Sequence, residues 1–166
     1  MNGLAATFAD HALARRTPAG LLPLGGRMTS TYGHLTWIQT SEADKARAVI
    51  LNASANEDHG HITLETDTVL SMTVAIGVAA AAPDEVVVLP AVPYGFNEHL
   101  KDFSGVIWTP PETLSAFVRD TTKSLAHQGF RRVLGVNSHG SDHPVLDLAA
   151  HKTVIDTLIL SHGDHH

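Results

Sequence analysis

Short apolar runs alternate with helical patterns along most of the chain. Residues 48–54 (AVILNAS) form a short apolar run rich in β-branched side chains and predict a buried strand, and residues 86–90 (VVVLP) and 132–136 (RVLGV) predict a second and a third strand. Residues 153–160 (TVIDTLIL) have a similar composition and predict a fourth strand. Strands that alternate with helices favour a mainly parallel sheet covered on both faces, which is a three-layer α/β sandwich.

Helical periodicity fills the segments between these runs. Residues 66–82 are apolar nearly all round, with Thr66 in position to cap a helix, and residues 113–128 carry their large apolar side chains on one face. Gly129 stands where that second helix is expected to end. Shorter helices are predicted for 4–16, for one or two turns capped by Ser41, and for 142–152.

The first 34 residues differ in pattern from the rest of the chain. Residues 17–33 contain repeated proline and glycine, which predicts a loop or an arm. Residues 35–166 carry the alternating pattern and are numerous enough to bury one core. We therefore expect an N-terminal helix and arm over 1–34, followed by a single α/β domain over 35–166.

Composition and charge narrow the classes of partner. The chain has a formal net charge of −6 and no run of Lys or Arg, so neither nucleic acid nor an anionic membrane is an expected partner. Its most apolar stretch, 74–82, is far shorter than the roughly 18 residues that span a bilayer. Cysteine is absent, and charged residues interrupt the N-terminus where a secretory signal needs an apolar run. These features predict a cytoplasmic protein.

A run of polar residues follows the first predicted strand, at the sheet edge where parallel α/β folds bind ligands. Glu57 and His59 are two residues apart, so an extended segment would direct both side chains to one side. Asp67 begins the next helix, where the helix dipole favours an ionised carboxylate. Carboxylate oxygens and imidazole nitrogens bind Zn and Mn, and a carboxylate at Asp67 could bridge two ions. The alternative is a solvated polar loop.

A second polar run, residues 137–142 (NSHGSD), begins where the third predicted strand ends. Gly140 allows a sharp turn there, and His139 is expected to point into the same crevice. The alternative for His139 is a structural histidine held by hydrogen bonds. Asp142, which precedes Pro144 by two residues, is typical of a helix N-cap.

These motifs together resemble the creatininase (creatinine amidohydrolase) family. That family has E-Q-H-G-P-H-L-P-L-x-T-D, then a Tyr-Gly…Glu-His segment, then N-G-H-G-G-N. The counterparts here are residues 57–67 (EDHGHITLETD), 93–99 (PYGFNEH) and 137–142, in the same order and with similar spacing. The resemblance covers about residues 49–148 and implies a creatininase-like α/β fold.

The resemblance also implies a metal site. Counterparts of Glu57, His59, Asp67 and His139 bind divalent ions in the family, with the aspartate as the bridge. The implied cofactor is Zn or Mn, one or two ions per chain. Family members commonly form hexamers, so a homo-oligomer is expected.

The chain departs from the family pattern at an acidic ligand. The family places this ligand either at the position of Ser141 or in a later segment, and neither has a match here. Asp142 is the local substitute that we predict as a ligand, although a helix N-cap is its alternative role. Asp164 and His165 form a second candidate in the tail.

The predicted activity is hydrolysis of a C–N bond in a small amide or cyclic amide by metal-activated water. Glu57 or Asp58 would move the proton, and His139 completes the predicted catalytic set. The alternative is a catalytically lapsed creatininase-fold subunit with a binding or assembly role. The candidate substrate-binding residues are His61, Tyr94 and Trp108, for which core or loop packing is the alternative.

Overall fold

Three parallel strands form the centre of the structure, a computed structural model that describes residues 31–163, with side chains in the last helix described as far as Val154. They are β1 (Ala48–Ala53), β2 (Val86–Val88) and β3 (Arg132–Asn137), in the order β2-β1-β3. All six residues of β1 pair with β3, while only its first three pair with β2. The long β1–β3 pairing brings the carboxyl ends of these two strands together.

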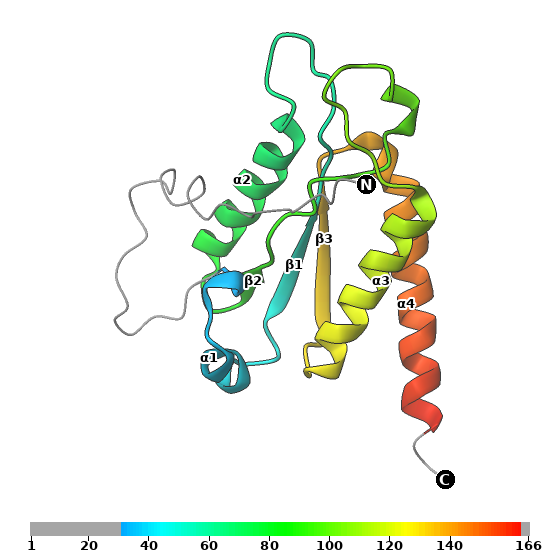
Figure 1. Cartoon of the computed structure of the whole chain (residues 1–166). Helices are drawn as coiled ribbons and strands as arrows, with labels where there is room; N and C mark the ends of the chain where they lie inside the picture. Colours follow the sequence, from blue (N-terminus) through cyan, green and yellow to red (C-terminus); the bar gives the residue numbers. More distant parts are fainter. Residues whose placement is uncertain (1–30, 164–166) are drawn as a thin grey trace, which may run out of the picture.

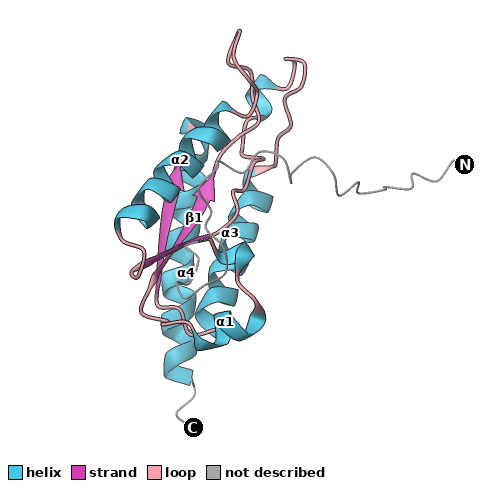
Figure 2. Cartoon of the chain, turned by 90° about the vertical axis from the view of Figure 1, so that its left-hand side faces the viewer, coloured by secondary structure: helices cyan, strands magenta, loops and turns pink. Residues whose placement is uncertain are grey.

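Helices cover both faces of the sheet (Figure 1 and Figure 2). One face carries α2 (Thr66–Ala81), and the other carries α3 (Pro111–His127) and α4 (His143–Gly163). The short helix α1 (Trp37–Glu42) lies near the amino end of β1 (Figure 1). The predicted three-layer α/β sandwich with a mainly parallel sheet is therefore confirmed.

Alternation along β1 divides the core into two layers. Ile50 packs beneath α2 against Ala75 and Ala79, whose small side chains let the helix approach the sheet closely. Val49 and Leu51 point to the opposite face, toward α3 and α4. Because β1 is buried on both faces, its sequence is apolar except for Asn52, whose side chain donates to the Leu89 carbonyl at 3.1 Å.

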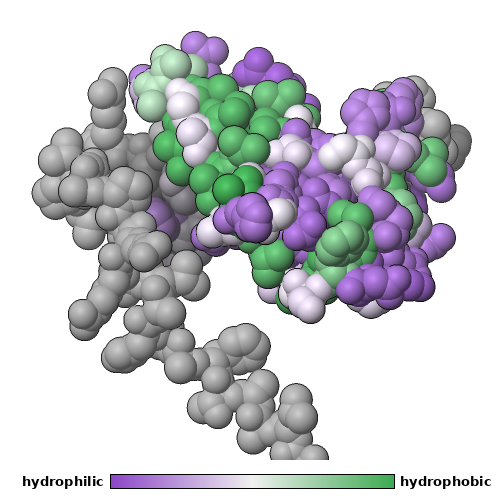
Figure 3. Space-filling model, turned by 90° about the horizontal axis from the view of Figure 1, so that it is seen from above, coloured by the Kyte–Doolittle hydropathy of each residue, from purple (hydrophilic) through white to green (hydrophobic). Residues whose placement is uncertain are grey.

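The outer side of α2 is apolar and exposed. Seen from above, hydrophobic side chains gather on the side of the molecule where α2 lies, next to a hydrophilic area (Figure 3). No helix within residues 31–163 is both long enough and apolar enough to cross a bilayer. The exposed apolar residues of α2 include Val69, Leu70, Val74 and Ile76.

The predicted fourth strand over residues 153–160 is wrong. This segment continues α4, which runs without a break from His143 to Gly163. Ala149 is buried against α3, and one turn later the buried Thr153 donates its hydroxyl to the Ala149 carbonyl. The β-branched composition suggested a strand, but helical packing against α3 overrides that local preference.

Other element boundaries shift by smaller amounts. The helix predicted to begin after a Ser41 cap is wrong: α1 begins at Trp37, because Thr36 and Gln39 form a capping box, and it ends at Glu42, one residue after Ser41. Thr66 is the first residue of α2 and not its cap. The predicted helix over 4–16 and most of the predicted arm lie outside the described residues, so the division at residue 34 stays a prediction.

Candidate metal centre

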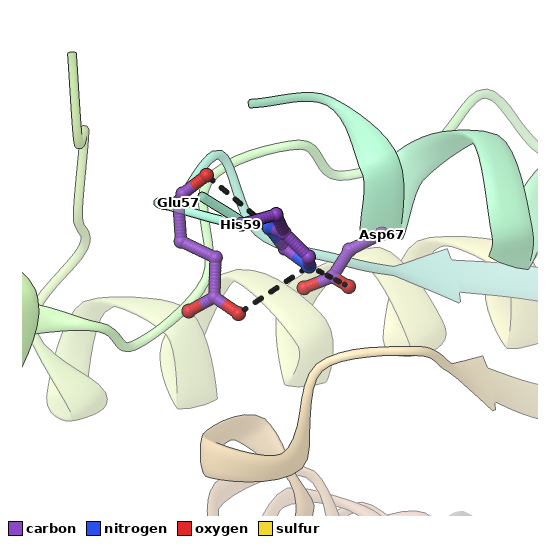
Figure 4. A group of neighbouring side chains, drawn as sticks. All are labelled: Glu57, His59 and Asp67. Atoms are coloured by element: carbon purple, nitrogen blue, oxygen red, sulfur yellow. Dashed lines mark hydrogen bonds and ion pairs between the residues drawn. The ribbon is translucent and has the colours of Figure 1, made fainter. Parts of the chain in front are cut away.

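Four of the predicted site residues converge at the carboxyl end of the sheet. Glu57 and His59 lie on the loop after β1, Asp67 lies in the first turn of α2, and His139 follows β3. Glu57, His59 and Asp67 point toward one another and offer ligand atoms within 4.8 Å of each other (Figure 4). The order β2-β1-β3 explains the convergence, because β1 and β3 are neighbours and end side by side.

The ring of His59 has one nitrogen committed to the backbone. Its Nδ1 lies 3.3 Å from the Glu57 carbonyl oxygen, which can only accept a hydrogen bond, so Nδ1 carries a proton. Its Nε2 lies 3.2 Å from Asp67 Oδ1 and 3.8 Å from Glu57 Oε1. Burial lowers the pKa of His59, but the Glu57 carbonyl and the negative charge of Asp67 outweigh burial and raise it above its usual value.

The ring of His139 repeats this arrangement from the other strand. Its Nε2 lies 3.2 Å from the Phe96 carbonyl oxygen and therefore donates to it. Its Nδ1 lies 3.2 Å from Asp67 Oδ2 and 3.3 Å from Glu57 Oε2. Each carboxylate thus turns one oxygen to His59 and the other oxygen to His139.

The donor set fits a divalent cation. In a neutral imidazole the second nitrogen is an acceptor, so both rings would direct lone pairs at carboxylate oxygens. Asp67 Oδ2 is buried and has no hydrogen-bond partner within the described residues. When both rings are neutral, a cation among these groups would accept their lone pairs and balance the carboxylates, and carboxylate with imidazole is a ligand set that suits Zn or Mn. Histidines that donate their other N–H to a carbonyl are usual among metal ligands.

Hydrogen bonds around β3 hold the second half of the site. Asn137 accepts from the His139 N–H at 3.1 Å and donates to the His139 carbonyl at 2.7 Å, which closes a turn. Ser138 donates its hydroxyl to the Asp67 carbonyl at 2.6 Å and so joins β3 to α2. Sequence reasoning did not single out Asn137, Ser138 or Phe96 as supports. The first two stand inside a recognised motif, whereas Phe96 acts through its backbone.

Asp142 lies next to this cluster but is engaged elsewhere. Its side chain is fully buried, and Oδ1 accepts the Phe96 N–H at 2.6 Å instead of capping α4. Burial raises the pKa of this carboxyl above its usual value. This contact does not test the predicted role of Asp142 as a metal ligand. The second candidates, Asp164 and His165, lie outside the described residues.

The remaining predicted residues occupy other positions. Asp58 accepts the Gly60 N–H at 3.2 Å and so stabilises the turn of its own loop. His61 is exposed on that loop, and Trp108 is 40% exposed before α3. Tyr94 lines an apolar cleft of about 490 Å³ beside α3. Their roles in catalysis or substrate binding stay predictions.

The family of the chain follows from its match to a family model. A family model described as creatinine amidohydrolase matches residues 33–162, most of the chain. The chain belongs to the creatininase family. The resemblance inferred from the motifs is therefore confirmed, and the match extends beyond the motifs on both sides.

This chain covers only part of the length of each of the individual proteins to which it is similar. The mycofactocin precursor peptide peptidase of Mycobacterium tuberculosis is 30% identical over 104 residues, which are 57% of this chain and 41% of that protein. A solved creatinine amidohydrolase superposes with a TM-score of 0.75 at 24% identity, over 80% of this chain and 54% of that one. A manganese form of creatininase gives 0.75 at 22% identity, over 81% and 55%. The chain thus spans about half the length of the proteins it matches.

Proposed function

We propose that this chain is a metal-dependent amidohydrolase subunit that acts on a C–N bond of a small amide or cyclic amide. One observation carries the proposal. Two imidazole rings each give one nitrogen to a backbone carbonyl and turn the other toward the same two carboxylates, Glu57 and Asp67. An arrangement that serves only the fold has no need to place four such groups together.

Zn or Mn is the proposed cofactor, with Glu57, His59, Asp67 and His139 as its ligands. The contacts divide these ligands into two groups, each with one imidazole nitrogen and one oxygen from both carboxylates. This division is compatible with two ions, and Asp67, the more buried carboxylate, is the bridge that the family resemblance implies. Solved creatininases include a manganese form and a Zn-Zn form. When bound, such an ion lowers the pKa of water toward neutrality and polarises an amide carbonyl.

Glu57 is the proposed catalytic proton carrier. Its carboxylate is partly exposed, unlike that of Asp67, so water and substrate can reach it. It can take a proton from the attacking water and give it to the leaving nitrogen. Asp58 is the second candidate, but its carboxylate holds the Gly60 N–H in the loop turn. His139 would hold its position while the proton moves, because its ring is buried.

The substrate is proposed only by class. A small or cyclic amide follows from the family, while the mycobacterial relative is named for a peptide precursor. Nucleic acid is not an expected partner, because the net charge is −6. The homo-oligomer and the cytoplasmic location stay predictions.

A lapsed subunit with a binding or assembly role is the alternative from another class. The convergence of Glu57, His59, Asp67 and His139 favours a working site over it. A subunit that no longer binds metal has no chemical reason to keep these four groups aimed at one another.

Metal analysis and amide hydrolysis on the full-length chain test the proposal. We expect one or two Zn or Mn ions per folded chain, and hydrolysis within a panel of creatinine, linear amides and short peptides. Glu57→Gln removes both the proposed proton carrier and a proposed ligand, so turnover should fall by at least roughly 10²–10⁴-fold, and the metal content of the variant separates the two causes. Glu65→Gln, an exposed change at the start of α2, serves as the control and should leave turnover unchanged. A folded chain that binds no divalent ion would support the lapsed subunit.

A further inference from the structure

The backbone of Phe96 is held from both sides by residues that follow β3. Its N–H donates to Asp142 Oδ1 at 2.6 Å, and its carbonyl accepts from His139 Nε2 at 3.2 Å. These two contacts join positions 46 and 43 residues apart in sequence. The residue whose carbonyl accepts from the His139 ring thus also donates its N–H to Asp142.

Gly95 shows how closely Asp142 fits against this segment. A Cβ atom at Gly95 would lie 2.5 Å from Asp142 Oδ2 and 2.6 Å from Oδ1, closer than real Cβ contacts allow. Gly95 does not have a positive φ, so backbone conformation does not require glycine there. Space for the Asp142 carboxylate does require it. The Gly95 carbonyl in turn accepts the Thr109 N–H at 2.9 Å, which holds the segment from the other end.

Burial of the Asp142 carboxylate costs free energy. A fully buried carboxylate loses its hydration, and here only Oδ1 has a hydrogen-bond partner, while Oδ2 has none in the described part of the chain. A buried carboxylate of this kind is retained more readily where it fixes a geometry that an apolar residue could not. The geometry fixed here is that of the Phe96 backbone.

We propose that Asp142 is a positioning residue for the metal centre and not itself a ligand. Through Phe96 it keeps His139 turned so that Nδ1 faces Glu57 and Asp67. The inference rests on the proposed function where it concerns metal affinity. It rests on the contacts alone where it concerns the orientation of the ring.

Two substitutions at Asp142 separate positioning from ligation. The amide oxygen in Asp142→Asn can still accept the Phe96 N–H, although the negative charge is gone. A positioning role therefore predicts a Kd for Mn²⁺ within about 3-fold of the wild type, and unchanged stoichiometry. Asp142→Ala removes the acceptor, and we expect a Kd about 10–100-fold higher, as is usual when a supporting hydrogen bond behind a ligand is lost. Calorimetric titration of the full-length protein measures both.

Gly95→Ala tests the same contact from the other side. The added methyl group would push the Asp142 carboxylate off the Phe96 N–H, so Mn²⁺ affinity should fall about as much as in Asp142→Ala. In the Asp142→Ala background the same methyl group meets no carboxylate and should cost no further affinity. The two changes should therefore be strongly non-additive. If Asp142→Ala does not fold, Gly95→Ala still breaks the contact and Asp142→Asn still keeps it, so the affinities of these two variants contrast the two states.

A second readout does not depend on metal. In the metal-free wild type, the His139 Nε2–H that donates to Phe96 should give a ¹⁵N-correlated NMR signal slow to exchange with water. Asp142→Ala and Gly95→Ala should speed its exchange, and Asp142→Asn should not. Loss of one ion in Asp142→Asn would make Asp142 a ligand and overturn the inference. Wild-type affinity and slow exchange in folded Asp142→Ala and Gly95→Ala would also overturn it. Absence of metal in the wild type, with the exchange pattern intact, would count against the proposed function alone.

Discussion

The two histidines of the site are held in opposite ways. His59 is 20% exposed in its side chain, and its contacts reach only two and eight residues along the chain. His139 is 3% exposed, and its ring is set by a carbonyl 43 residues away. One half of the site is thus built from a single loop and the start of the helix that follows it. The other half exists only once the segment around Phe96 has packed onto the end of β3.

The difference indicates that the fold itself holds the His139 half of the site, whereas a bound metal ion would hold the His59 half. The buried His139 side is secured by hydrogen bonds among Asn137, Phe96 and Asp142. The His59 side faces solvent and has fewer long-range supports. Asp67 alone joins the halves from a buried position, because its two oxygens face different rings.

Substitution of Asp67, which joins the two halves, should have the largest effect on metal binding and hydrolysis. Asp67→Asn keeps the shape of the side chain but withdraws the charge that both rings share, so we expect both halves to lose metal. Hydrolysis should fall roughly 10³-fold or more, since a catalytic ion contributes several kcal/mol. Metal content and turnover measure the loss. Asp84→Asn, an exposed change of equal charge, is the control. If Asp67→Asn retained one ion on either histidine, the two halves would be independent sites.

Replacement of each histidine by alanine should lower the free energy of unfolding by different amounts. In the metal-free protein, His139→Ala leaves a buried void and an unpaired Phe96 carbonyl, so the free energy of unfolding should fall by about 2–4 kcal/mol. His59→Ala, at a partly exposed position, should cost less than about 1 kcal/mol. Urea unfolding monitored by circular dichroism measures both. Equal losses would mean that burial does not distinguish the two halves.

Sequence reasoning found the four candidate ligands of both halves, but not the contacts that hold the buried half. Glu57, His59 and Asp67 fall within one short run, and the rule that parallel strands end at one sheet edge predicted His139 beside them. The support from Phe96 could not be found this way, because a backbone carbonyl leaves no mark on residue type. The burial of Asp142 could not be predicted either, because an aspartate just before a helix usually caps it.

The fold shows the same division between local and long-range information. The runs in β1 and β2 were recognisable because their residues are buried and mostly apolar, whereas β3 is an edge strand with exposed side chains and was recognised from its short apolar run alone. The segment from Thr153 was misassigned because its composition suits a strand, while its packing partner, α3, lies more than two dozen residues away. Tertiary contact, and not local preference, decided its conformation.

The smallest expected effect concerns the loop that carries His59. Gly105 has a φ of +90°, and a Cβ atom there would lie 2.6 Å from the Leu64 side chain, which ends the loop. Gly105→Ala should therefore destabilise the protein by about 1–2 kcal/mol through backbone strain, and should also displace the loop. Gly129→Ala is the matched control, because Gly129 has a φ of +95° and an added Cβ atom there would meet the Lys45 side chain, which is not part of the site. Both variants should lose similar stability in urea, whereas only Gly105→Ala should weaken Mn²⁺ binding, by a few-fold at most, with the His139 Nε2–H signal unchanged. Faster exchange of that signal in Gly105→Ala would show that the loop also supports the buried half, and the separation drawn between the two histidines would not hold.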